Sequence, residues 1–185
     1  METGEPILCA HVMATRGSTD AARAGAPTGW ATRTLYAALL TVGLMAGLFF
    51  AWDVSVMPGL ARLDDRAYVT TMQILIVAIE NAGFYLVVLG ALVFTAWSAY
   101  LHRRQGGGRW IAVALGCYVL ALAITMVVHM PLNLDLLQVG QTDPGAARAT
   151  FETPWRVGNV ARTAACSIAL LCLGRASMLA GPTRR

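Results

Sequence analysis

Residues 34–52, TLYAALLTVGLMAGLFFAW, contain no charged side chain and decide the fold class of this chain. A hydrocarbon core of about 30 Å is crossed by about 20 apolar residues at a helical rise of about 1.5 Å per residue. The stretch therefore predicts a membrane-spanning helix. Gly43 and Gly47 within it have the GxxxG spacing that lets helices approach closely, so we expect helix packing here, inside a bundle or in a homo-oligomer.

The composition agrees with a membrane protein. Of the 185 residues, 57% are hydrophobic and 13% are charged, which is more apolar than the soluble average. The net charge of +4 does not indicate a nucleic-acid partner, because the arginines stand at the ends of apolar blocks and form no basic patch. The four cysteines form no C-x-x-C pair, and we expect Cys117, Cys166 and Cys172 to be small buried side chains.

Three further apolar blocks predict spans over residues 82–101, 109–129 and 155–173, after the first at 34–52. The apolar pattern begins earlier, at Tyr68, so we expect an extracytoplasmic helical extension that leads into the second span. Residues 131–155 are polar and rich in turn formers, and they predict a long loop. The fold expected is an all-α, integral membrane four-helix bundle over residues 33–180.

The two ends of the chain predict tails. Residues 1–32 have no periodic apolar pattern and suggest a disordered cytoplasmic tail, and residues 181–185 form a basic tail. Met13 is a second candidate start, so the first 12 residues are interpreted as a start-site artefact.

Arginine placement predicts the orientation in the membrane. The positive-inside rule favours a topology with both termini in the cytoplasm, and we expect the protein in the plasma membrane. The residues on the cytoplasmic side are then Arg16, Arg23, Arg33, Arg103, Arg104, Arg109, Arg175, Arg184 and Arg185, and those on the other side are Arg62, Arg66, Arg148, Arg156 and Arg162.

This orientation brings polar side chains to the outer ends of the spans. His129 and Asn133 are four residues apart and share a helical face, and Trp155, Asn159 and Arg162 form a similar row. The polar residues expected at this depth are Asp53, Glu80, Asn81, His129, Asn133, Trp155, Arg156, Asn159 and Arg162. Two polar faces therefore predict one shared pocket.

Pro131 and Arg162 strengthen this prediction. Pro131 lacks an N–H and crowds the carbonyl of Val127, so the helix should kink or end there and open space. Alternatively, Pro131 simply ends a helix at the membrane interface. Arg162 is costly inside an apolar run, and it either snorkels outward or is held by acceptors such as Glu80 and Asp53.

His129 is the only histidine within the predicted spans, which excludes paired axial haem ligands. The absence of C-x-x-C likewise excludes a thiol oxidoreductase of the four-helix kind. A metal ion held by His129 with Glu80 and Asp53 remains an alternative, although no local spacing supports it.

Five motifs in order resemble a known family. They are FFAWDVSVMPGL (49–60), YVTTMQ (68–73), ENAGF (80–84), HMPLN (129–133) and PWRVGNVART (154–163). Together they resemble the anthrone oxygenase-like family of small four-span membrane proteins, and the resemblance covers residues 34–175. The matching positions are Gln73, Asn81, His129, Pro131, Asn133, Trp155, Asn159 and Arg162.

The resemblance implies a bacterial membrane oxygenase of antibiotic polyketide biosynthesis that oxidises an anthrone methylene to a quinone carbonyl with O2. We expect no cofactor, and we expect membrane lipids and a small apolar aromatic substrate as partners. His129 is the candidate base, and Arg162 with Asn133 or Asn159 would stabilise the oxyanion. The candidate substrate-binding residues are Gln73, Glu80, Asn81, Trp155 and Asn159.

Two other hypotheses about the function stay open. A non-catalytic membrane protein could bind a lipid, a quinone or another apolar metabolite, or could scaffold a partner, with the polar cluster as structural glue. A transporter is a third reading, but four spans without a visible inverted repeat make alternating access difficult outside a dimer.

Overall fold

The computed structural model describes residues 29–180, and this part of the chain is helical throughout, with short turns and no strand. The all-α prediction is confirmed. The segments, with η for a π-helical turn, are α2 (Gly29–Ala51), η1 (Trp52–Val56), α3 (Met57–Leu60), α4 (Asp65–Ile79), α5 (Ala82–His102), α6 (Gly108–Ile124), η2 (Thr125–His129), α7 (Met130–Val139) and α8 (Pro144–Ala180). Residues 29–32, which the sequence places in a tail, belong to α2, and the rest of both predicted tails lies outside the described residues.

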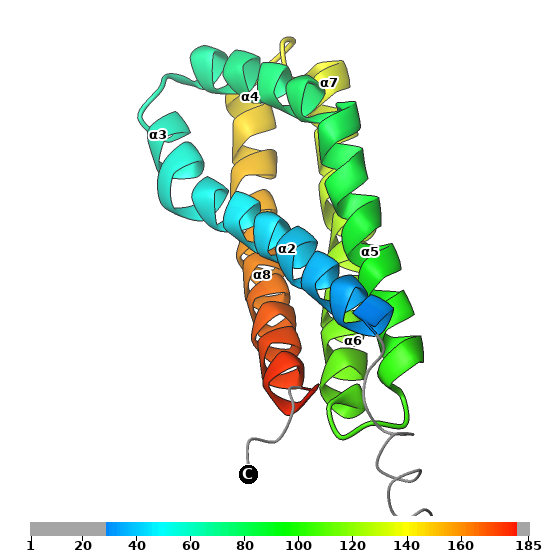
Figure 1. Ribbon diagram of the computed structural model, residues 1–185. Helices are drawn as coiled ribbons and strands as arrows, with labels where there is room; N and C mark the ends of the chain where they lie inside the picture. Colours follow the sequence, from blue (N-terminus) through cyan, green and yellow to red (C-terminus); the bar gives the residue numbers. More distant parts are fainter. Residues whose placement is uncertain (1–28, 181–185) are drawn as a thin grey trace, which may run out of the picture.

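Four continuous helical stretches are long and apolar enough to cross a membrane, as predicted. They are Gly29–Leu60, Ala82–His102, Gly108–Val139 and Pro144–Leu179. In Figure 1, α4 lies across one end of the bundle, which we call the α4 end. The start of α2, the α5–α6 turn and the end of α8 lie together at the opposite end.

Small side chains let the spans approach closely. Helix α2 packs on α5 and α8, and α6 packs on α8 and α5. Ala38, Ala91, Ala114 and Ala169 are fully buried where these helices meet. Gly43 faces a leucine methyl of α8 at 3.7 Å from its would-be Cβ, so one glycine of the GxxxG pair is used inside the bundle.

The predicted extension before the second span is a separate helix, α4. It starts at Asp64, whose carboxylate accepts from the Ala67 N–H at 2.9 Å. Helix α5 starts at Asn81, whose side-chain oxygen accepts from the Phe84 N–H at 3.1 Å. Each helix has its own N-cap, and the chain turns between the two helices at residues 80–81. Helix α4 therefore does not continue into α5 but lies across the end of the bundle (Figure 1).

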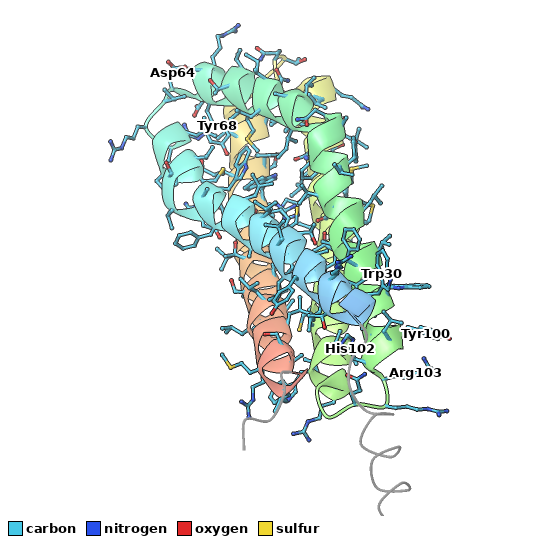
Figure 2. The ribbon with its side chains drawn as sticks, viewed as in Figure 1. Trp30, Asp64, Tyr68, Tyr100, His102 and Arg103 are labelled. Atoms are coloured by element: carbon cyan, nitrogen blue, oxygen red, sulfur yellow. The ribbon has the colours of Figure 1, made fainter. Side chains whose placement is uncertain are left out.

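Arg148 of α8 links α8 to α4. Its guanidinium contacts Asp65 at 3.1 Å and Glu152 at 2.9 Å, and it lies 4.5 Å from the centre of the Tyr68 ring. Burial, and then the charge of Glu152, raise the pKa of Tyr68 above its usual value near 10. Tyr68 is therefore neutral at physiological pH, and Figure 2 shows it beneath α4 near Asp64.

The predicted loop over residues 131–155 is wrong. The third helix continues through Pro131 to Val139, and α8 begins at Pro144 after a four-residue turn. The π turn η2 immediately precedes Pro131, and there the Met130 N–H bonds to the carbonyl of Thr125, five residues back. This change of register accommodates the proline, so the helix neither ends nor breaks.

The first helix uses the same device. In η1 the Met57 N–H bonds to the carbonyl of Trp52, and Pro58 follows directly. Both π turns therefore end at a Met-Pro pair. The first carries Asp53 and the second carries His129, and π turns of this kind often mark functional sites.

Candidate functional site

A cavity of about 200 Å³ lies beneath α4 between the spans. Its walls are mostly apolar and come from α2, α4, α5, the third helix and α8. The side chains with polar atoms along the wall are Trp52, Glu80, Tyr85, Thr125, His129, Asn133, Trp155 and Arg162. Five predicted site residues therefore share one cavity: Glu80, His129, Asn133, Trp155 and Arg162.

His129 closes η2 and is 2% exposed. Its Nε2 atom is buried and has no hydrogen-bond partner, while Nδ1 lies 3.5 Å from the carbonyl of Ile124. The ring meets Trp155 edge-on, with the ring centres 5.1 Å apart. The imidazole is thus held by packing, and Nε2 is the ring nitrogen without a hydrogen bond.

Gly158 makes this packing possible. A Cβ atom at this position would lie 2.7 Å from Cε1 of His129 and 3.2 Å from a methyl group of Val128. Real Cβ contacts essentially never reach 2.7 Å, so any side chain here would displace the imidazole. The lack of a side chain lets His129 lie directly against α8.

Arg162 lies in the same wall and is 7% exposed. Its Nη2 donates to the side-chain oxygen of Asn159 at 2.7 Å, and its Nη1 lies 3.3 Å from Oγ1 of Thr125. The guanidinium lies 4.3 Å from the centre of the Phe49 ring. Its Nε is buried without a partner, so the cation retains an unused donor.

Asp53 reaches Arg162 only through Asn159. The Asn159 Nδ2 donates to Oδ1 of Asp53 at 2.6 Å and to the carbonyl of Phe49 at 2.9 Å. The other Asp53 oxygen accepts from Oγ1 of Thr163 at 2.5 Å. The ion pairs found within residues 29–180 do not include Arg162. The expected acceptor Asp53 therefore does not contact Arg162 directly and is connected to it by the side chain of Asn159.

Asn133 and Trp155 form a second polar pair in the wall. The indole N–H of Trp155 donates to Oδ1 of Asn133 at 3.1 Å. Its ring packs against Trp52 at 5.0 Å and against Phe151 at 6.2 Å between ring centres. This bond orients the Asn133 amide so that its oxygen is occupied and its NH2 group is available as a donor.

Three predicted substrate-binding residues lie outside the cavity wall, because their amides hold backbone in place. Gln73 donates to the carbonyl of Leu136 at 2.7 Å and accepts from Gln141 at 2.8 Å, which ties α4 to the end of α7. Asn81 caps α5. Asn159 is fully buried behind Arg162, with both ends of its amide occupied.

For the metal alternative, the neighbours of His129 are informative. Within residues 29–180 there is no group of three or more His, Cys, Asp or Glu side chains that could hold a metal ion. The indole ring of Trp155 and the backbone at Gly158 lie against His129, and Arg162 is in the same wall; none of these is a typical metal ligand. The three cysteines of the described part are free; Cys166 and Cys172 are buried as predicted, whereas Cys117 is only partly buried.

Sequence reasoning misses three contributors: Thr125, Gly158 and Thr163. Thr125 stands four residues before His129 and is recoverable from helical spacing. Thr163 directly follows Arg162 but donates to Asp53, which lies in the π turn of the first helix, 110 residues away in the sequence. Gly158 carries no chemical group, and its role appears only when the distance to His129 is known.

Comparison with known proteins identifies a family. Searches of curated proteins and of solved structures found no match. A family model described as anthrone oxygenase matches residues 74–172, just over half of the chain. The match includes the five predicted residues that line the cavity, and it extends from α4 into the last turns of α8. The chain therefore belongs to the anthrone oxygenase family.

Proposed function

We propose that this protein is a membrane oxygenase that converts the methylene group of an apolar, anthrone-type polyketide to a quinone carbonyl. The observation that carries the proposal is that two residues of one apolar cavity wall, His129 and Arg162, each have a buried side-chain nitrogen without a hydrogen-bond partner. These atoms are Nε2 of His129 and Nε of Arg162. Unsatisfied buried polar atoms are costly, which favours a site that a ligand completes.

The chemistry suits these two groups. The anthrone methylene lies between two aryl rings and is conjugated with a ketone, so loss of a proton gives a carbanion whose charge spreads onto the carbonyl oxygen. The carbanion transfers electrons to O2 and forms a carbon–oxygen bond, and the resulting peroxide anion takes back the proton to give a hydroperoxide. Loss of water from the hydroperoxide leaves the quinone, so that one methylene group and one O2 give one carbonyl and one water.

The roles of the side chains follow from their free atoms. Nε2 of His129 takes the proton from the methylene, since it is the free nitrogen of the ring. Nε of Arg162 and the NH2 group of Asn133 donate to the developing oxyanion. Asn159, an expected alternative donor, is less suited, because its N–H groups already donate to Phe49 and Asp53.

The size and the apolar lining of the cavity support an apolar ring system as substrate. Its volume of about 200 Å³ is below the roughly 300–1,000 Å³ of typical small-molecule pockets, so it suits the reacting ring system better than a whole substrate with appendages. Tyr85, Met126 and Met130 line the cavity and are also 47%, 57% and 42% exposed. The route between α5 and the third helix is therefore the proposed entrance from the lipid phase.

Oxygen uptake tests the proposal. Membranes that contain the protein should consume O2 in the presence of a hydroxylated anthrone, above the spontaneous oxidation. His129→Ala should lower this rate about 100-fold or more, the usual contribution of a general base. His102→Asn is the matched control, because His102 is also buried but does not line the cavity, and it should retain activity.

Two outcomes would contradict the proposal. Wild-type membranes without uptake above background would rule out this substrate class, and binding of a quinone without uptake would favour a non-catalytic binding protein. We further propose that no cofactor is required. Loss of activity after chelation, restored by iron or copper, would instead support the metal alternative at His129.

A further inference from the structure

We propose that Asp53 is a positioning residue that acts on Arg162 through the side-chain amide of Asn159 and so presents the guanidinium to an anionic oxygen in the cavity. That this oxygen belongs to a ketone conjugated with a carbanion rests on the proposed function. The arrangement Asp53–Asn159–Arg162 does not, because it is defined by hydrogen bonds within the chain.

The amide of Asn159 can adopt only one orientation in this arrangement. Its NH2 group donates to two acceptors, a carboxylate oxygen of Asp53 and the carbonyl of Phe49, and its oxygen accepts from Arg162. A flipped amide would set its oxygen against both acceptors and its NH2 against a cation. Since Asn159 is fully buried, no water would relieve that conflict.

Asp53 is itself fixed from both sides. One oxygen accepts from Asn159 at 2.6 Å and the other accepts from Oγ1 of Thr163 at 2.5 Å. The Thr163 hydroxyl is itself held on α8, because Oγ1 also lies 3.1 Å from the backbone carbonyl of Asn159. The carboxylate therefore lies on the side of Asn159 that faces away from the guanidinium.

The neutral amide between the two charges has a chemical consequence. A carboxylate in direct contact with Arg162 would occupy several of its donors and cancel much of its field. Placed one amide away, Asp53 still compensates the cation in an apolar environment, while Nε of Arg162 stays unpartnered. The arrangement keeps a buried cation both compensated and available.

An exchange of the two side chains tests this inference. The double variant D53N/N159D has the same atoms and the same net charge, but its carboxylate would contact Arg162 directly. We expect kcat for anthrone oxidation to fall at least about tenfold, a part of the roughly 100- to 1,000-fold cost of losing one oxyanion donor. An unchanged kcat would show that Asp53 only balances charge, which would overturn the proposal.

A second variant covers the case in which the exchanged protein does not fold. Thr163→Val keeps every charge and removes one donor that fixes Asp53. Positioning predicts a fall in kcat of about fivefold, the equivalent of one ordinary hydrogen bond, with little change in KM. Full activity in Thr163→Val would contradict it. Asp135→Asn is the matched control, because Asp135 is an exposed carboxylate of α7 and does not line the cavity.

Two readouts do not depend on turnover. Thermal unfolding of D53N, R162M and D53N/R162M should be non-additive, with the double variant more stable than the two single losses predict. A bound hydroxyanthraquinone should ionise at lower pH in the wild type than in D53N/N159D, as followed by its visible absorbance. If wild type consumes no O2, the proposed function fails, and these readouts still decide the role of Asp53: additive unfolding or an unchanged ionisation would overturn it.

Discussion

At the scale of single residues, the position of the imidazole depends on a residue with no side chain. His129 lies against α8 only because Gly158 leaves room, and its ring then meets Trp155 edge-on. Nε2, which has no hydrogen-bond partner, lies next to Cε1 on the same side of the ring, 3.4 Å from where a Cβ of residue 158 would be. The smallest residue of the PWRVGNVART motif thus sets the geometry of the proposed base.

Gly158→Ala should therefore separate geometry from chemistry. The added methyl group would lie 2.7 Å from Cε1 of His129, so the ring must move while every polar group of the site remains. We expect oxygen uptake to fall at least about tenfold, and the free energy of unfolding to fall by about 1–3 kcal/mol, the usual cost of overpacking. The measurements are O2 consumption and thermal unfolding in detergent.

Gly174→Ala is the matched control for this variant. Gly174 lies on the same helix, and a Cβ there would meet nothing within 4 Å. It should keep both activity and stability, with any change favouring the helix. Equal activity of Gly158→Ala and Gly174→Ala would show that the position of His129 against α8 is unimportant.

At the scale of helices, the sequence predicts where spans start more reliably than how they continue. Asn81 has the side chain of an N-cap and the second span does begin directly after it. Pro131 was expected to kink or end the third helix; the helix does not end there, because a π turn precedes the proline and the helix continues to Val139. A π turn leaves no compositional mark, since it differs from an α turn only in hydrogen-bond register.

Pro131→Ala tests the role of that π turn. Alanine restores an N–H that can bond to the carbonyl of Val127, so an ordinary α turn can replace η2. Such a change rotates His129 by roughly 100° per residue relative to Asn133. We expect most of the activity to be lost while stability stays equal or rises, by up to about 3 kcal/mol.

Pro154→Ala provides the comparison for this variant. Pro154 lies inside α8, is exposed and does not line the cavity. Its replacement should preserve oxygen uptake, and unfolding temperatures of both variants show whether the helices remain stable. Full activity in Pro131→Ala would mean that the π turn accommodates the proline without serving the site.

At the scale of the whole molecule, the depth of the site is predictable from topology but the direction of each amide is not. Equal depth correctly brings His129 and Arg162 into one cavity. Asn159 and Gln73 carry the same side-chain amide as Asn133, which lines the cavity, yet both donate to backbone carbonyls of other helices. Those carbonyls belong to every residue type alike, so the sequence cannot distinguish an amide that braces the fold from one that meets a ligand.

In the described part of the chain, the α4 end of the bundle carries both acidic side chains and arginines, whereas the charged side chains of the opposite end are all arginines. Within residues 29–180, the acidic side chains all belong to η1, to α4 and its flanks, to α7, or to the turn before α8 and its first turns. The opposite end carries Arg33, Arg103, Arg104, Arg109 and Arg175. Arg103 lies 4.1 Å from the centre of the Tyr100 ring, and Figure 2 shows this pair with Trp30 at the same end. Such a collar of arginine and aromatic side chains is typical of a membrane interface.

We therefore predict that the opposite end faces the cytoplasm and that the cavity lies in the outer half of the membrane. Gly106 and Gln138 are exposed at the two ends, so each can be changed to cysteine in a Cys9→Ser background. A membrane-impermeant maleimide should label Gln138→Cys on intact spheroplasts of a bacterial host, and should label Gly106→Cys only after permeabilisation. The reverse pattern would place α4 and the cavity at the cytoplasmic face. The outcome also decides how substrate arrives, because only a cytoplasmic cavity could take it directly from a soluble synthase, whereas an outer cavity requires it to dissolve in the membrane first.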